Sequence, residues 1–171
     1  MQHIIFTTQN KNLNYNISMY KSEHFTDSLF YQIELTAKYC RSLGMQVFSK
    51  LNMPLTVDEY SAMDVIVLHE GICQRELAKL ILKDRPNTGR ILNSLEEKGY
   101  IERFVDTKNN RLVRKMVITD EGKKVFKYAS GVLREHLLKI PKLISQEEKD
   151  FVKTICKKLR EGLKNEVESK I

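Results

Sequence analysis

Four polar side chains within six residues have the chemistry needed to bind a nucleic acid: Arg85, Asn87, Thr88 and Arg90. Guanidinium groups donate to phosphate oxygens and to guanine edges, whereas amide and hydroxyl side chains contact adenine or the sugar-phosphate backbone. Such a set can reach base edges when it projects from the N-terminal end of one helix. The spacing therefore predicts a DNA-binding helix that carries these four residues on its outward side.

The flanking sequence predicts the helix that would hold them and a shorter helix before it. Asp84 can accept from the free N–H groups of a helix that starts next to it, and Pro86 suits the first turn, where no N–H is needed. Gly99 suits the end of this helix, because glycine adopts the left-handed conformation readily. Its apolar side is formed by Ile91, Leu92 and Leu95. An amphipathic helix is predicted upstream over residues 73–82.

A basic β-hairpin is predicted after the second helix, because the apolar residues change from helical spacing to alternation. The two segments rich in β-branched and aromatic residues are 100–105 and 112–118. Residues 106–111 between them are turn-forming, and residues 102–115 contain five cations and two anions. Lys108 and Arg111 lie on the predicted loop, from which a cation can reach phosphates or the minor groove.

Further helices are predicted on both sides of this unit. Each starts at a residue that can act as an N-cap: Thr26, Thr56, Thr119 and Ser145. The apolar stripes of residues 25–51 and 119–171 exceed what a compact winged domain can cover, so these segments are predicted to be dimerisation helices that pack on a second copy. The predicted fold is mainly α with a small β-hairpin wing (α+β): a winged helix-turn-helix with N- and C-terminal dimerisation helices.

The residues of the second helix and the hairpin resemble the signature of the multiple antibiotic resistance regulator (MarR) family. The resemblance is carried by the run LEEKGYIER from Leu95 to Arg103, by Asp106 and Arg111, and by the run ITDEG from Ile118 to Gly122. It is close over about fifty residues, and the order of the helices extends it from about Thr26 to the C-terminus. Members of this family are dimeric winged-helix transcription factors, usually repressors. They are released from DNA by small phenolic or other ligands or by cysteine oxidation, and in a few cases zinc controls them.

The resemblance implies where this chain would contact double-stranded DNA. The four residues of the second helix would face the major groove, and Arg111 would reach the minor groove from the wing. The family usually has an acidic residue two positions before the wing arginine, whereas this chain has Asn109. The ion pair that braces the arginine is therefore absent here or formed by Asp106.

Length and composition fit one domain. The chain has 171 residues and a net charge of +7, which favours a polyanionic partner without requiring one. We expect an N-terminal extension over residues 1–24, with Met19 as a candidate alternative start, and a single MarR-like domain over 25–171, in which 56–118 form the winged helix-turn-helix. No apolar run is long enough to cross a bilayer and no export signal is evident, so we expect a cytoplasmic protein without a membrane partner.

The sequence leaves the regulatory signal open. Cys73 stands at the N-cap of the first short helix, where the helix dipole can stabilise a thiolate, and Cys40 lies on the stripe of the first long helix, where oxidation-sensing relatives carry a reactive cysteine. Both are candidate redox sensors, although the favoured readings are a packing residue for Cys40 and a poorly capping small residue for Cys73. The histidines and cysteines lack metal-site spacing, and no cofactor is indicated. A small-molecule effector is the other candidate signal.

The sequence also bears on two other classes of protein. An enzyme would need a nucleophile–base set, clustered carboxylates or a glycine-rich phosphate loop, and the sequence shows none of these. A winged domain can also serve as a protein-interaction module that does not read DNA. Such a module should present an apolar or acidic face, whereas Arg85, Arg90 and Arg111 predict a basic one.

Overall fold

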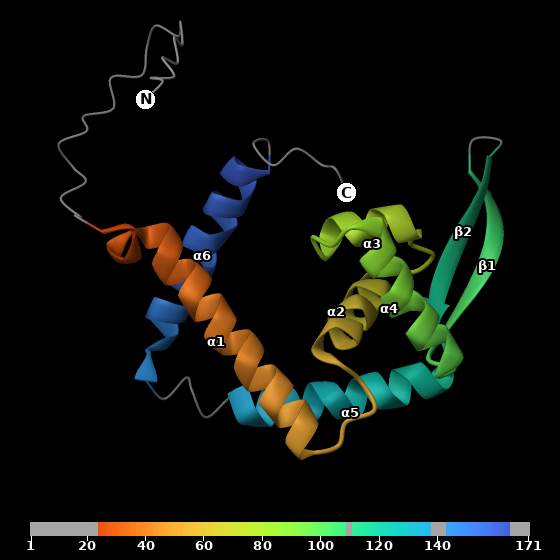
Figure 1. Cartoon of the computed structure of the whole chain (residues 1–171), viewed down its shortest axis with the longest axis horizontal. Coiled ribbons are helices and arrows are strands. Elements are labelled where there is room, and N and C mark those ends of the chain that lie inside the picture. The colour runs from red at the N-terminus through yellow and green to blue at the C-terminus, as the bar shows by residue number, and fades with distance from the viewer. Residues whose placement is uncertain (1–23, 109–110, 138–142, 165–171) are drawn as a thin grey trace, which may run out of the picture. The chain divides into compact units, whose positions relative to one another are not determined.

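The computed structural model describes residues 24–108, 111–137 and 143–164, so the expectations for Met19 and Asn109 lie outside the described residues. A 3-10 turn at Phe25–Asp27 precedes eight elements (Figure 1). They are α1 (Leu29–Lys50), α2 (Val57–Leu68), α3 (Gln74–Leu80), α4 (Arg85–Glu97), β1 (Ile101–Lys108), β2 (Arg111–Ile118), α5 (Asp120–Leu137) and α6 (Gln146–Leu163). The chain divides into two compact units, Met1–Cys40 and Arg41–Ile171, and α1 runs through the boundary.

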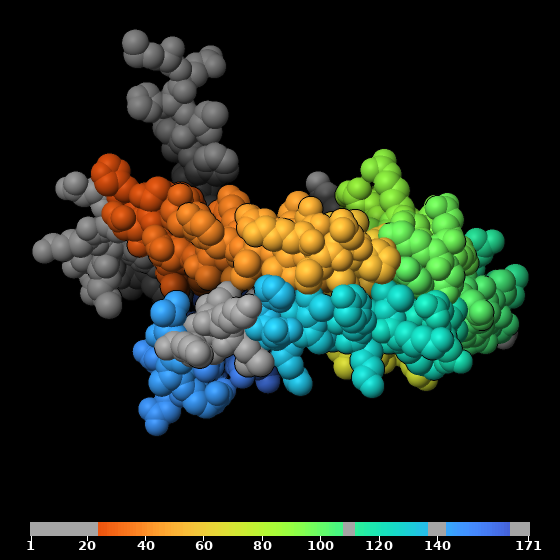
Figure 2. Space-filling view, turned by 90° about the horizontal axis from the view of Figure 1, so that it is seen from below, coloured from red at the N-terminus to blue at the C-terminus, as the bar shows by residue number. Residues whose placement is uncertain are grey.

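The second unit contains a winged helix-turn-helix, which confirms the predicted fold class. Helices α2, α3 and α4 contact one another, and α2, α3 and α4 also contact the hairpin. A continuous core joins these elements to residues 41–50 of α1 and to α5; its fully buried large side chains include Met63, Ile66, Leu77, Leu92, Leu95, Ile101 and Met116. The C-terminal part of α1 crosses α5 (Figure 1), and the surface view of Figure 2 shows α5, in cyan, lying against it.

Helix starts follow the predicted capping residues in three of four cases. The Thr56 hydroxyl accepts from the Glu59 N–H while the Glu59 carboxylate accepts from the Thr56 N–H, and Ser145 forms the same box before α6. The Thr119 hydroxyl accepts from the Gly122 N–H at 3.0 Å. The prediction for Thr26 was wrong: it lies in the 3-10 turn. The Ser28 hydroxyl instead accepts from the Tyr31 N–H, in the first turn of α1.

The hairpin is longer than predicted. Its strands pair antiparallel from Ile101 opposite Ile118 to Lys108 opposite Arg111. The expected six-residue turn was therefore wrong, because residues 106–108 and 111 belong to the strands. Pairing continues because each added pair contributes ladder hydrogen bonds, and Asp106 gains an ion pair with Lys115, its diagonal neighbour across the ribbon, at 2.6 Å.

Some apolar residues are less buried than the sequence suggested. Helix α2 buries Ala62, Met63 and Ile66, yet Leu68 at its C-terminal end is 69% exposed. Leu80, the last residue of the amphipathic helix α3, is 54% exposed. Helix α3 buries Leu77 and Ala78 and ends at Leu80. Within the described residues, no helix has the length and apolar character needed to span a membrane.

Candidate nucleic-acid interface

The N-terminus of α4 is fixed by a network that starts at its N-cap. An Asp84 carboxylate oxygen accepts from the Asn87 N–H at 2.7 Å, and Pro86 lies in the first turn. The Asn87 amide group donates to the second Asp84 oxygen at 2.5 Å, and the Arg90 guanidinium donates to the Asn87 amide oxygen at 3.2 Å. Upstream, the Gln74 side chain of α3 donates to the Arg85 carbonyl at 3.0 Å. This end of α4 is therefore held in place before any ligand binds.

Three of the four residues expected on the outward side of α4 are exposed: Arg85, Asn87 and Arg90. They offer two guanidinium groups and one amide within the first two turns of a helix. The helix dipole favours anions at this end, although the Asp84 carboxylate already accepts from the Asn87 N–H. The arrangement suits phosphate oxygens and the acceptor atoms of guanine.

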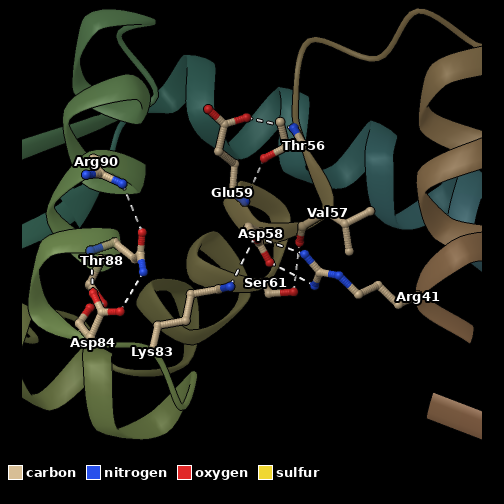
Figure 3. Close-up of polar contacts among 11 residues, drawn as sticks. Arg41, Thr56, Val57, Asp58, Glu59, Ser61, Lys83, Asp84, Thr88 and Arg90 are labelled. Atoms are coloured by element: carbon tan, nitrogen blue, oxygen red, sulfur yellow. Dashed lines mark hydrogen bonds and ion pairs between the residues drawn. The ribbon is translucent and has the colours of Figure 1, made fainter. Parts of the chain in front are cut away.

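Thr88 does not lie on this surface, so its expected outward orientation was wrong. The residue is fully buried, and its hydroxyl donates to the Asp84 carbonyl at 2.8 Å (Figure 3). A β-branched residue in the first turn can return its hydroxyl to the preceding turn while its methyl group packs inward. Thr88 therefore stabilises the start of the helix and leaves contact with a ligand to its neighbours.

Two cations of the hairpin, Arg103 and Lys115, form ion pairs with acidic residues. Arg103 is tied to α4, since its guanidinium donates to the Asn93 side chain at 2.6 Å and pairs with Glu96 at 3.1 Å. Lys115 pairs with Asp106. The hydrogen bond between these two side chains raises the pKa of Lys115 and lowers the pKa of Asp106. Arg114 is exposed, and Lys108 and Arg111 occupy the end of the ribbon, where their strand positions are defined.

The three cysteines lie on different helices or caps. All three thiols are free. Cys73 is the N-cap residue of α3, and its N–H donates to the Glu76 carboxylate at 3.2 Å. It is half-buried and also pairs through its backbone with Lys115 of β2. Cys40 is exposed on α1 and Cys156 is half-buried on α6. Among the described residues, no three His, Cys, Asp or Glu side chains gather where they could hold a metal ion.

Glu59 is a buried carboxylate. Its part in the capping box of α2 is local, but the sequence did not reveal its contacts with α4. It is 3% exposed, and one oxygen accepts from the Ser94 hydroxyl at 2.6 Å and from the Lys98 ammonium at 2.7 Å. Burial raises the pKa of this carboxyl, but the hydrogen bonds from Lys98, Ser94 and the Thr56 N–H outweigh it, so the net pKa is lowered. Glu59 therefore binds the C-terminal half of α4 to the start of α2.

Removal of this carboxylate should destabilise the winged domain. Glu59→Ala leaves Ser94 and Lys98 without their partner, and we expect a loss of about 2–3 kcal/mol in the free energy of unfolding, measured with urea. Because the folded-state pKa is lowered, the stabilisation is present above the ordinary pKa of the group and is lost as the pH falls through the folded-state value. Between neutral and acid pH, the free energy of unfolding of Glu59→Ala should therefore fall less than that of the wild type.

An exposed acidic residue supplies the matched control for this prediction. Glu121 of α5 pairs with Lys124 at 3.1 Å, and both side chains are largely exposed. Glu121→Ala should change the free energy of unfolding by less than about 0.5 kcal/mol. Equal effects of the two substitutions would contradict the role assigned to Glu59.

Comparison with known proteins agrees with this geometry. The sequence model of the MarR family matches residues 55–113. The HTH-type transcriptional regulator YybA of Bacillus subtilis is 28% identical over 80% of this chain and 89% of its own length. BilQ of Clostridium symbiosum, also an HTH-type transcriptional regulator, is 32% identical over 52% of this chain and 61% of its own length.

Solved structures share the fold at low sequence identity. The MepR–DNA complex of S. aureus superposes with a TM-score of 0.67 at 20% identity, over 82% of this chain and 99% of MepR. The apo form of MarR from E. coli gives a TM-score of 0.65 at 21% identity, over 77% of this chain and 96% of MarR. The matched segment 55–113 contains α2, α3, α4 and β1. Residues 55–113 thus match the sequence model of the MarR family, and the fold is that of the solved MarR and MepR structures.

Proposed function

We propose that this protein is a sequence-specific transcriptional regulator that acts as a homodimeric repressor on an inverted-repeat operator. The observation that carries the proposal is the exposed, preorganised set Arg85, Asn87 and Arg90 at the positive end of α4, beside a basic hairpin (Figure 1). A helix of this kind in the major groove reads base edges, while cations on the wing bind the backbone or minor groove. The DNA complex of MepR, a protein of the same fold, supports this reading.

Exposed apolar residues support the homodimer. Leu29, Phe30 and Ile33 are 56%, 53% and 37% exposed on α1, and Phe151 and Val152 are 67% and 54% exposed on α6. Apolar stripes of this kind are normally covered by a partner. Two-fold symmetry would set the two recognition helices about 34 Å apart, one turn of DNA, and would require an inverted repeat.

Two candidate signals would release the DNA. A hollow of about 410 Å³ lies between α1, α2 and α4, and its lining includes the apolar residues Met45, Val57 and Ile91 together with Arg41 and Arg90. A small organic ligand in this hollow would lie next to a residue of the recognition surface. Oxidation of Cys73 or Cys40 is the second candidate, because both thiols are free.

The alternative is a winged-helix protein-interaction module. The exposed side chains at the N-terminus of α4 are basic and polar, which suits a polyanion better than an apolar protein surface. An interaction module would bind its partner without a dependence on DNA sequence.

Genome-wide footprinting, with and without peroxide, tests the proposal. The repressor reading predicts occupied inverted repeats that overlap promoters, with higher transcription of the adjacent genes after deletion of the protein. The thiol reading predicts that peroxide empties these sites in the wild type but not after Cys40, Cys73 and Cys156 are all changed to Ser. Absence of any sequence-specific footprint would leave the interaction module as the better reading.

The wing supplies a separate prediction. Arg111→Ala should weaken operator binding and reduce the slope of log K against log salt by about 0.9, because one phosphate contact releases about one counterion. Titration of labelled operator at several salt concentrations measures both quantities. Arg134→Ala, which removes an exposed arginine from α5, is the matched control and should leave the slope unchanged. An unchanged slope for Arg111→Ala would remove the wing arginine from the interface.

A further inference from the structure

Asp58 lies at the centre of an ion triad that joins three parts of the winged unit. The Arg41 guanidinium on α1 donates to both carboxylate oxygens of Asp58, at 2.9 and 3.0 Å. The Lys83 ammonium, in the turn between α3 and α4, approaches one of these oxygens at 3.1 Å (Figure 3). The hydrogen bonds from Arg41 lower the pKa of Asp58. Partial burial opposes this shift, whereas Lys83 adds to it. The carboxylate therefore stays ionised and holds both cations at neutral pH.

The turn that contains Lys83 has a backbone conformation that needs support. Leu82 has a φ of +51°, the left-handed region, which costs a residue with a Cβ about 1–2 kcal/mol. The Lys83 N–H donates to the Ala78 carbonyl at 3.0 Å, the six-to-one bond that usually closes a helix over glycine. Leu82 is 73% exposed, so its own side chain contributes little packing. The ion pair of Lys83 with Asp58 is a contact that stabilises this turn.

The same turn determines where the recognition surface begins. Asp84, the residue after Lys83, is the N-cap of α4 and accepts hydrogen bonds from Asn87. A shift of Lys83 would therefore move the cap and the exposed side chains that follow it. The other half of α4 is held by Glu59, the neighbour of Asp58 on α2. Consecutive carboxylates at the start of α2 thus hold α4 from its preceding turn and from its C-terminal half.

We propose that Asp58 is a positioning residue for DNA binding: through Lys83 it fixes the turn before α4, and through Arg41 it makes this turn depend on α1. The inference rests on the proposed function, because it assigns a role in reading DNA. Asp58 itself touches no DNA in this scheme. Its effect passes through the orientation of Arg85 and Asn87, at the start of α4.

The sign of the effect separates positioning from simple electrostatics. Loss of one carboxylate makes the protein more positive, and the long-range field alone predicts equal or stronger DNA binding. Positioning predicts the opposite. Asp58→Asn should weaken operator binding about three- to tenfold and leave the salt slope unchanged, since a partly exposed charged contact is lost without loss of a phosphate contact.

The experiment compares Asp58→Asn with Glu121→Gln, which removes a carboxylate paired to a lysine on α5. Operator affinity is measured at several salt concentrations, and amide hydrogen exchange is followed across residues 82–88 of the full-length protein. Lys83→Gln is the second variant, because it breaks the pair while it leaves Asp58 in the first turn of α2. Asp58→Asn and Lys83→Gln should each accelerate exchange in this segment about three- to tenfold. Arg41→Gln should add no further loss of affinity to Asp58→Asn.

The outcomes are distinct. Weaker binding and faster exchange in Asp58→Asn, with neither in Glu121→Gln, support the inference. Wild-type exchange in both Asp58→Asn and Lys83→Gln overturns it, as does tighter operator binding by Asp58→Asn. A wild-type protein that binds no DNA refutes the proposed function and the DNA-reading role together, whereas exchange still reports whether Asp58 holds the turn.

Discussion

Simultaneous replacement of Arg85 and Arg90 by alanine is expected to weaken operator binding by about a hundredfold or more, because a specific arginine contact contributes about 1–3 kcal/mol. Both side chains are exposed on the first turns of α4, and Arg90 is already oriented by its hydrogen bond to Asn87. The variant should remain folded, since neither residue contributes to the core. Fluorescence anisotropy with labelled operator measures the loss, and circular dichroism checks the fold.

Discrimination between sequences is the more specific readout of the same variant. If the two arginines read bases, affinity for the operator should fall towards affinity for a scrambled duplex of the same length. Arg134→Ala, an exposed arginine removed from α5, should retain most of the discrimination. Retained discrimination in the Arg85 and Arg90 double variant would mean that another element reads the sequence.

Gly122→Ala is expected to lower the free energy of unfolding by about 2–4 kcal/mol. Gly122 is buried in the first turn of α5, directly against the Tyr100 carbonyl. An added Cβ would overlap that oxygen and would lie 2.8 Å from Ile118 Cγ1. Backbone and strand side chain would both have to move, which would disturb the junction of the hairpin with α5. Urea unfolding monitored by circular dichroism measures the change.

A second glycine of the same helix provides the control with the opposite sign. An added Cβ at Gly131 of α5 meets no atom within 4 Å. Because alanine has the higher helix propensity, Gly131→Ala should raise the free energy of unfolding by about 0.5–1 kcal/mol. Destabilisation by both substitutions to a similar extent would show that the close approach at Gly122 is not the cause.

The parts of the fold that the sequence predicts are those fixed by contacts between residues close together in the chain. Asp84, Thr56 and Ser145 each act on N–H groups within three residues, so their caps are visible in the sequence and are confirmed. Glycine at residue 99 has a φ of +70° and ends α4 as expected. The hairpin follows from alternation of β-branched residues. The wrong helix start at Thr26 also has a local reason, because Ser28, two residues later, can cap equally well.

Contacts between distant residues were the part that local patterns could not predict. Glu59 reads as a capping-box residue, and only the fold brings it to Ser94, 35 positions away. Asp58 likewise meets Arg41 and Lys83 from separate elements. Thr88 was assigned to the outward side because its hydroxyl is polar, although that hydroxyl is satisfied within the helix. The types and positions of the residues in the sequence therefore suggested which side chains face DNA. The contacts that hold those side chains in place became visible only in the folded structure.

Sequence-specific DNA binding is tested by titrating the wild-type protein against an operator recovered by footprinting and against a scrambled duplex, at two or more salt concentrations. A dimeric regulator that reads DNA sequence should bind the operator at least about a thousandfold more tightly than the scrambled duplex, with one dimer per inverted repeat and an affinity that falls steeply as salt rises. Equal affinity for the two duplexes, or no binding at low salt, would contradict sequence-specific binding.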